Sequence, residues 1–347
     1  MAVTDCDSFD HYNTSQITHK NHAQFGLNSP YTAPAITTAA ARKTNGLLLQ
    51  GGGNVYRSFA DTQTVAFGFA CRPVTLSNRR ICALRDETTI QLYIQMSATG
   101  AVFLYRGNGT LLGSAATVFE PGQWHYLELS ATISDTAGSY DLRIDNISEL
   151  SSVGSADTQV SANQRVNILS LGDPNNNPEQ MHYDDLYITD GNLLGPVKVD
   201  VLRPNGGVPG FMEMSVVGAG SHYQALFDTT PDGDTSYVYS PFNMPGSVQF
   251  SEFEDMGDVT GGAIFAAAVR TYVRKEYGNT RGFQTGVYPG TADSASGTMQ
   301  FYATTNPHYV EAEFAYHSDI YNTNPGTGGT WTVPSIKELR AGFRRII

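Results

Sequence analysis

Two stretches of the sequence decide the fold: Gly122-Gln-Trp-His-Tyr-Leu-Glu-Leu-Ser-Ala-Thr-Ile133 and His182-Tyr-Asp-Asp-Leu-Tyr-Ile-Thr-Asp190. In the first, a Pro-Gly turn precedes a strand whose apolar residues indicate a buried position. The segment 139–145 predicts a second strand that pairs back after a turn at 136–138. In the second stretch, a pair of aspartates precedes a final hydrophobic strand. Both stretches predict core strands of an antiparallel β-structure.

The segments before the first stretch predict further strands of the same kind. Apolar side chains alternate along 64–71 and 89–96, and the Gly-Asn-Gly turn at 107–109 joins two short strands into a hairpin. A period of two with one apolar face is typical of an antiparallel sheet that covers a core on one side. Composition agrees, because 35 Gly, 16 Pro and only 16% charged residues favour short strands joined by turns over helices.

The order of these strands, together with 168–172 and 183–190, is similar to that of concanavalin A-like (laminin G-like) jelly rolls. The resemblance covers roughly residues 9–192. It implies a β-sandwich of a type that binds or assembles more often than it catalyses. A fold of this kind does not by itself define a function.

The composition changes after residue 191, where Gly and Pro at 195–196 and 204–209 indicate a linker or crossing. Alternation predicts strands at 197–201, 247–254 and 297–303, and we interpret the ambiguous segment 263–275 as a strand too. A short helix is predicted at 331–342, with Pro334 in its first turn and Gly342 at its end, before a last strand at 343–347. We therefore predict an all-β chain of two antiparallel β-sandwich (jelly-roll) domains, 1–192 and 193–347, with one short C-terminal helix.

The second half carries its own resemblance, in Pro231-Asp-Gly-Asp-Thr-Ser-Tyr-Val238 and Asn324-Pro-Gly-Thr-Gly-Gly-Thr-Trp-Thr-Val-Pro334. These segments look like a recurrent β-sandwich domain of tailed-bacteriophage structural proteins. The resemblance spans about 195–347, and in that family such a domain often accompanies a concanavalin A-like domain. It implies a virion protein, of the head or the tail, that contacts other virion proteins and copies of itself.

Charge excludes two classes of broad-surface partner. The net charge is −12 and the pI is near 5.0, so the chain as a whole repels nucleic acid and anionic lipid. The N-terminus has no secretory signal, and no apolar run approaches the roughly 18–20 residues that span a bilayer. We expect a soluble protein that assembles into a virion in the host cytoplasm, with no nucleic-acid partner and no membrane insertion.

One candidate metal site remains open. Asp173, Asp184 and Asp185 supply the oxygen ligands that calcium prefers, and Asn175, Asn176 and Asn177 lie nearby. The dense aspartate spacing of a self-contained calcium loop is absent. The alternative is that these residues form turns and cap their own backbone. No other cofactor is expected.

Catalytic patterns are mostly missing. Glu252 and Glu254 are two apart on a predicted strand, but a solvent-facing acidic edge explains them better than a glycosidase pair. Glycan binding is the open small-ligand hypothesis, because tyrosines are abundant; tryptophan, a better platform, occurs only at 124 and 331. We expect a non-enzymatic protein that acts through assembly contacts. The alternative is a host-glycan-binding receptor module, and a third possibility is a glycan depolymerase.

Overall fold

The computed structural model describes residues 1–20, 34–172, 180–241, 245–256, 262–276, 280–289, 301–304 and 307–346. The chain forms two compact units, Met1–Asp200 and Val201–Ile347. Both are built from antiparallel strands, so the all-β prediction is confirmed. Each unit is described below by itself.

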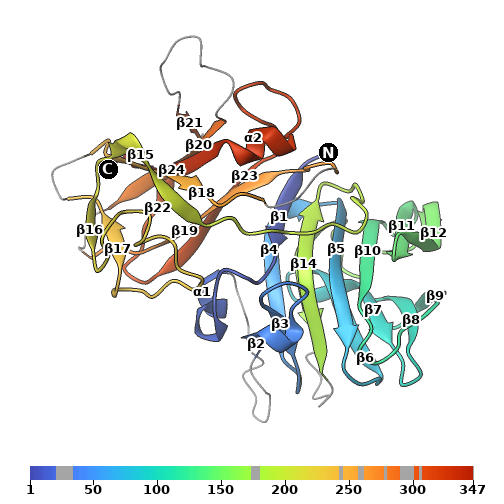
Figure 1. Cartoon of the computed structure of the whole chain (residues 1–347). Coiled ribbons are helices and arrows are strands. Elements are labelled where there is room, and N and C mark those ends of the chain that lie inside the picture. Colours follow the sequence, from blue (N-terminus) through green and yellow to red (C-terminus); the bar gives the residue numbers. More distant parts are fainter. Residues whose placement is uncertain are drawn as a thin grey trace. The chain divides into compact units, whose positions relative to one another are not determined.

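The first unit contains two sheets, which Figure 1 shows as two layers. Sheet A has the order β12-β11-β10-β5-β14-β3-β2, and β1 also pairs with β14. Its strands are β1 (Val3–Asp7), β2 (Ala35–Thr37), β3 (Gly46–Leu49), β5 (Thr64–Pro73), β10 (His125–Thr132), β11 (Gly138–Ile144), β12 (Ile147–Ala156) and β14 (Met181–Thr189).

Sheet B has the order β4-β13-β6-β7-β8-β9. Its strands are β4 (Asn54–Thr62), β6 (Arg79–Asp86), β7 (Thr89–Met96), β8 (Ala101–Arg106), β9 (Leu111–Val118) and β13 (Val166–Gly172). The helix α1 (Ile17–Lys20) and the 3-10 turns η1 (Thr14–Gln16) and η2 (Thr38–Ala40) lie in the connections near the N-terminus.

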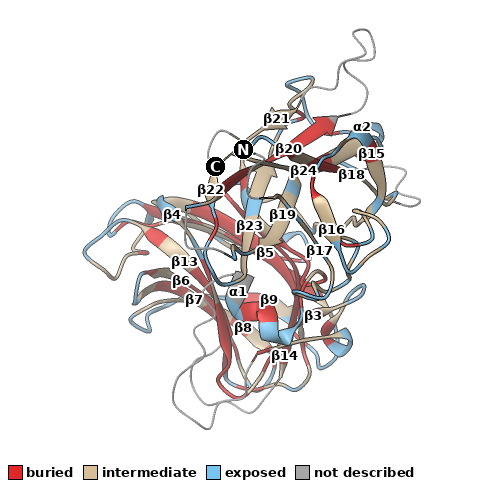
Figure 2. Cartoon of the chain, turned by 90° about the vertical axis from the view of Figure 1, so that its left-hand side faces the viewer, coloured by how far each residue is buried: buried red, intermediate tan, exposed pale blue. Residues whose placement is uncertain are grey.

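The core of the first unit lies between the two sheets. The central strands are buried over much of their length (Figure 2), and apolar side chains at alternate positions form the core, as the alternation predicts. In sheet A they are Val65, Phe67, Phe69, Leu127, Leu129 and Leu142, and in sheet B they are Leu84, Leu92, Ile94, Leu104, Leu169 and Leu171. Burial of each such side chain contributes about 1.5–3 kcal/mol before the opposing loss of chain entropy.

A buried ion pair joins the two sheets at one side of this core. Asp7 of β1 accepts hydrogen bonds from the guanidinium of Arg57 on β4 and from the hydroxyl of Tyr12. The side chains of both charged partners are nearly inaccessible to water. Removal of one partner would leave the other charge buried without compensation, which is strongly destabilising.

The strand β14 is buried along its whole length, because its outer face is covered too. Gly68 of β5 leaves room there: a Cβ at this position would lie 2.5 Å from the Tyr187 ring. The Tyr187 hydroxyl donates to the buried carboxylate of Glu128 on β10. Residues 192–200, which we call the strap, cover these side chains, and Gly195 N donates to the same carboxylate at 2.8 Å.

The second unit is centred on sheet C, with the order β15-β18-β24-β20-β21, and β22 also pairs with β20. Two further pairs are β16-β17 and β19-β23. The strands are β15 (Pro204–Met212), β16 (Ser215–Val217), β17 (Tyr237–Tyr239), β18 (Val248–Phe253), β19 (Ala267–Val273), β20 (Gly282–Pro289), β21 (Tyr302–Ala303), β22 (His308–Tyr309), β23 (Ala315–Tyr321) and β24 (Leu339–Arg345). One core cluster contains Val287, Trp331, Ile336 and Ala341.

The C-terminal helix exists but is shorter than predicted. It is α2 (Val333–Lys337), with Thr332 at its N-cap and Pro334 in its first turn. The prediction that Gly342 ends this helix is wrong, because Gly342 lies inside β24. A Cβ there would meet the Gln249 carbonyl oxygen at 1.9 Å, so glycine permits a close approach of two strands.

The predicted strand at 197–201 is also wrong. These residues do not pair with a strand; they form the end of the strap and the start of the second unit. The backbone of the strap bonds to side chains instead, with Val199 N donating to Asp185 at 2.8 Å. The strap packs on the first unit through Leu194 and Val197, and the first compact unit includes it, extending to Asp200.

Removal of the Tyr187 hydroxyl tests the role of the strap contact. Tyr187→Phe leaves the Glu128 carboxylate buried with one donor fewer, so we expect a loss of about 1–3 kcal/mol in the free energy of unfolding. Tyr105→Phe, at a partly exposed tyrosine of sheet B, is the matched control and should change stability little. Chemical denaturation followed by Trp fluorescence measures both, and equal stabilities of the two variants would contradict the assignment.

Candidate functional site

The predicted calcium ligands lie in β14 or just before it. Asp173 is outside the described residues. Asp184 and Asp185 form a bulge, where β14 shifts register against β5 and where Asp185 has a φ of 49°. The bulge falls where the partner of β14 changes from β3 to β1. Both aspartates are therefore at a junction of four strands.

Both carboxylates accept hydrogen bonds from this chain. Asp184 accepts from the backbone N–H groups of Arg42 at 2.6 Å and Asp185 at 2.8 Å. Asp185 forms an ion pair with the Arg42 guanidinium and accepts from Val199 N. These contacts fix the segment before β3 and the strap against β14. Whether a calcium ion also binds stays a prediction, because Asp173 is not described.

Burial dominates the electrostatics of the bulge. It raises the pKa of Asp184 to about 7 and raises the pKa of Asp185, although hydrogen bonds from the backbone act in the opposite direction. Among the residues that the structure describes, no group of three or more His, Cys, Asp or Glu side chains is arranged to hold a metal ion. No helix in the described ranges is long and apolar enough to cross a membrane.

The outer face of sheet B carries a different candidate site. Tyr56, Ser170, Ala83, Tyr93 and Tyr105 follow one another across five neighbouring strands, because they occupy paired positions of the register. Their inward neighbours form the core, so these side chains point away from it. Arg80, Arg85 and Phe103 lie beside them. We call this surface the tyrosine face: Tyr56, Arg80, Arg85, Tyr93, Phe103 and Tyr105.

Rings and guanidinium groups cover one another on the tyrosine face. The rings of Tyr93 and Tyr105 stack with centroids 5.0 Å apart and planes inclined by 12°. The guanidinium of Arg80 lies over Tyr93 at 4.7 Å, and that of Arg85 lies over Tyr56 at 4.9 Å. Each such cation–π contact contributes about 0.5–1 kcal/mol at exposed sites. The side chains of this face are therefore held in place before any partner binds.

The charge of sheet B is opposite to that of the chain. Its six strands contain five arginines and two aspartates, while the whole chain has a net charge of −12. Arg57 and Arg79 are buried and Arg106 pairs with Asp157, so Arg80 and Arg85 are the arginines of the tyrosine face. Both aspartates, Asp61 and Asp86, lie near strand ends and are paired with one arginine, Arg165. The tyrosine face is thus a basic and aromatic surface on an acidic protein.

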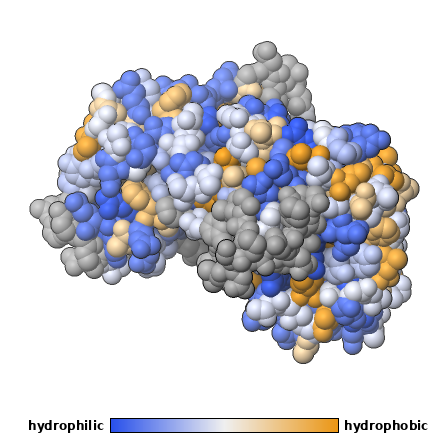
Figure 3. All heavy atoms as spheres, turned by 90° about the horizontal axis from the view of Figure 1, so that it is seen from below, coloured by the Kyte–Doolittle hydropathy of each residue, from blue (hydrophilic) through white to orange (hydrophobic). Residues whose placement is uncertain are grey.

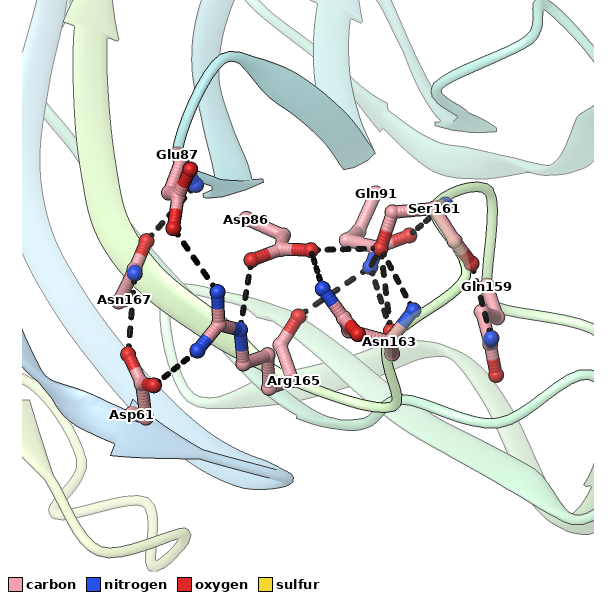
Figure 4. Close-up of polar contacts among 9 residues, drawn as sticks. All are labelled: Asp61, Asp86, Glu87, Gln91, Gln159, Ser161, Asn163, Arg165 and Asn167. Atoms are coloured by element: carbon pink, nitrogen blue, oxygen red, sulfur yellow. Dashed lines mark hydrogen bonds and ion pairs between the residues drawn. The ribbon is translucent and has the colours of Figure 1, made fainter.

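A polar network holds the loop of residues 157–165, which lies at one end of this face, as Figure 4 shows. Arg165 pairs with Asp61, with Asp86 at 2.8 Å and with Glu87 at 2.9 Å. The buried amide of Gln91 donates to Ser161 Oγ at 2.8 Å and to two backbone carbonyls of the loop. Burial by itself raises the pKa of Asp86, but the hydrogen bonds from Ser161, Asn163 and Arg165 outweigh it and lower this pKa below its ordinary value.

The acidic strand considered for catalysis has structural partners. Glu252 forms an ion pair with Arg340 at 3.1 Å, and Glu254 accepts a hydrogen bond from Arg203 N at 3.2 Å. Both carboxylates thus connect β18 to its neighbours. The sequence analysis missed Arg80 and Arg85, because an arginine on an exposed strand face carries no motif. The signal that could have found them was their place on the polar face of an otherwise apolar strand.

Comparison with known proteins gives no family. No family model and no curated protein matches the sequence. Among solved structures, domain 4 of AbnA, a GH43 extracellular arabinanase from Geobacillus stearothermophilus, is 16% identical with a TM-score of 0.40, covering 55% of this chain and 94% of that one. The catalytic domain of a glycoside hydrolase family 131 protein from Coprinopsis cinerea is 12% identical, with a TM-score of 0.37 and coverages of 55% and 95%.

The alginate lyase AlgAT5 of polysaccharide lyase family 7 is 10% identical, with a TM-score of 0.34 and coverages of 47% and 83%. These are distant similarities to β-sandwich domains of carbohydrate-active proteins with concanavalin A-like folds. At these TM-scores they carry no argument about activity or ligand. They show no phage origin.

His182, in the second stretch that decides the fold, provides a test by pH. Its Nδ1 accepts a hydrogen bond from Arg72 Nε at 3.1 Å, so the ring is neutral in the folded chain. Burial and the Arg72 charge lower its pKa to about 4, below the value near 6.5 of an unfolded chain. The unfolded state therefore binds more protons between these values, and stability is lost as pH falls from 6.5 towards 4.

We expect the change from pH 7 to pH 5 to cost the native chain about 2 kcal/mol more than it costs His182→Gln. The comparison with the variant is essential, because the raised pKa of Asp184 makes an opposite contribution that both proteins share. Denaturant unfolding at a series of pH values measures the difference. Parallel pH profiles of the two proteins would contradict a neutral His182.

Proposed function

We propose that this chain is a non-enzymatic structural component of a phage particle, and that the tyrosine face is a surface through which it binds another protein. The observation that carries the proposal is the stacked pair Tyr93–Tyr105 under the guanidinium of Arg80. Tyrosine and arginine are enriched among the residues that dominate protein–protein binding. Because their side chains are already held in place, binding costs less side-chain entropy.

The geometry of the rings favours a protein over a glycan as the partner. A sugar stacks on the free face of an aromatic ring. On the tyrosine face, Tyr93 is covered by Tyr105 and Arg80, and Tyr56 is covered by Arg85. The Arg85 guanidinium also donates to the Thr88 carbonyl oxygen at 3.0 Å. Guanidinium groups pair well with the carboxylates and carbonyls of a protein surface. The charge of the face further favours an acidic partner surface.

The virion part of the proposal rests on the second unit. Its quoted segments resemble those of tailed-phage structural proteins, and in the structure they serve the fold. Asp232 accepts hydrogen bonds from the backbone and hydroxyl of Ser236, and Trp331 is buried and donates to the Tyr321 carbonyl oxygen at 2.6 Å. A role in the fold is consistent with segments that recur across a structural family.

A host-glycan-binding module is the second candidate. The observation in its favour is that Arg80 and Arg85 lie on a face that also presents Phe103 and Gln95, which are paired across β7 and β8. Such a surface would select an anionic glycan, because guanidinium groups pair with carboxylates.

Incorporation into particles tests the proposal. The native chain, Arg80→Ala and Tyr105→Ala are produced in the host during infection, and mass spectrometry quantifies each in purified particles. We expect the native chain to be present and each variant to be reduced at least tenfold, as for residues that dominate an interface. Tyr309→Ala, at an exposed tyrosine of the second unit, is the control and should be incorporated normally.

Absence of the native chain from particles would contradict the virion role. Normal incorporation of both variants would contradict the role of the tyrosine face. Binding of an anionic host polysaccharide by the native chain, lost in Arg80→Ala, would favour the glycan-binding module instead.

A further inference from the structure

The exposed apolar residues of the first unit are concentrated on two edge strands. Apart from Met1, its large hydrophobic residues that are exposed in the described structure all lie on β9 and β12: Leu111, Val118, Ile147 and Val153. Ile147 is 62% exposed and Val153 is 89% exposed. Figure 3 shows hydrophobic residues along the right-hand edge of the molecule, the side on which β9 and β12 lie in Figure 1.

The two edges differ in how their backbone is protected. The Glu149 carboxylate of β12 accepts hydrogen bonds from Ala116 N at 2.6 Å and Thr117 N at 3.3 Å, so it occupies amides of β9. Leu150 of β12 also packs where Gly113 of β9 has no side chain. β12 therefore prevents another strand from pairing with this edge of β9. A charged group turned onto a strand edge is a usual protection against pairing.

The outer edge of β12 has no charged group turned onto it, although the strand shifts register twice against β11 and Gly154 has a φ of 64°. This strand pairs with β11 on one side, and in the described part of the chain no strand pairs with its other side. It contains no proline or lysine, and its one ionisable side chain, Glu149, is engaged with β9. Long edge strands without charges or proline are templates for pairing with another chain.

We propose that β12 pairs antiparallel with β12 of a second copy of this chain, so that sheet A continues from one copy into the next. The distribution of charge favours a second copy of this chain as the partner of β12. Most surfaces of two chains with a net charge of −12 repel each other, whereas β12 presents serines and apolar residues with no outward charge. An antiparallel pair of identical strands is self-complementary and closes as a dimer with two-fold symmetry. This contact is separate from the tyrosine face and does not depend on the proposed function.

Sedimentation of the full chain as a function of concentration tests the proposal. We expect a monomer–dimer equilibrium with a Kd in the micromolar range, as for a small interface. Val153→Lys and Ile147→Lys place two like charges at the contact and should each weaken the dimer at least tenfold. Val217→Lys, at an exposed valine of β16 in the second unit, is the matched control and should leave the equilibrium unchanged.

Disulfide trapping then distinguishes this pairing from other contacts. Single cysteines at Ser148, Ser151, Ser152 and Ser155 are introduced into a Cys6→Ser background, since Cys71 and Cys82 are buried. Only positions near the two-fold axis bring identical residues within the roughly 4.4–6.8 Å between Cα atoms that a disulfide requires. We expect one or two positions to form covalent dimers on mild oxidation, and Val153→Lys to prevent this.

A chain that stays monomeric at all concentrations would overturn the proposal. So would a dimer that survives Val153→Lys and Ile147→Lys, or one that no cysteine position traps. None of these results affects the proposal that the chain is incorporated into particles through the tyrosine face. Each of the two proposals can therefore be contradicted without the other.

Discussion

The structure of the first unit depends on the burial of β14 on both faces. Its inner face completes the core between the sheets, and its outer face is closed by the strap. The buried Glu128 carboxylate connects the two, because it accepts hydrogen bonds from Tyr187 and from Gly195 N. A carboxylate buried without these donors would be costly. The strap and β14 therefore stabilise each other.

This closure determines which surface remains for a partner. With the strap over β5, β10 and β14, the centre of sheet A is not accessible. The outer face of sheet B is partly exposed, and it carries Arg80 and Arg85 among its tyrosines. Its arginines lie over tyrosines, and its two aspartates are held by Arg165. The proposed function uses these arginines to attract an acidic partner surface.

The strands were predictable from the sequence where one physical rule dominates. Alternation identified β5 and β7, because inward residues such as Phe67 and Leu92 must be apolar. Alternation predicted a strand wrongly where a backbone N–H group bonds to a side chain and not to a neighbouring strand. Residues 197–201 alternate like a strand, yet the Val199 N–H donates to Asp185 and not to a neighbouring strand. Gly342 has the position of a helix end, but its absent Cβ serves a close contact with β18.

The site residues were less predictable, because they depend on partners that are distant in sequence. Asp184 and Asp185 were identified as possible metal ligands. The sequence could not show that both carboxylates accept hydrogen bonds from Arg42, which lies 142 and 143 residues away. The sequence showed only that tyrosines are abundant. Only the register of β7 and β8 shows that Tyr93 and Tyr105 stack, and only the register of β6 and β7 brings Arg80 to them.

Hydroxyl-radical footprinting of the chain, free and within purified particles, tests the central claim that the tyrosine face is a protein contact. The account predicts that Tyr93, Phe103 and Tyr105 are oxidised in the free chain and protected in the particle. Tyr187, which is buried under the strap, should resist oxidation in both states. Equal oxidation of Tyr93 and Tyr105 in the free and assembled chain would contradict the account.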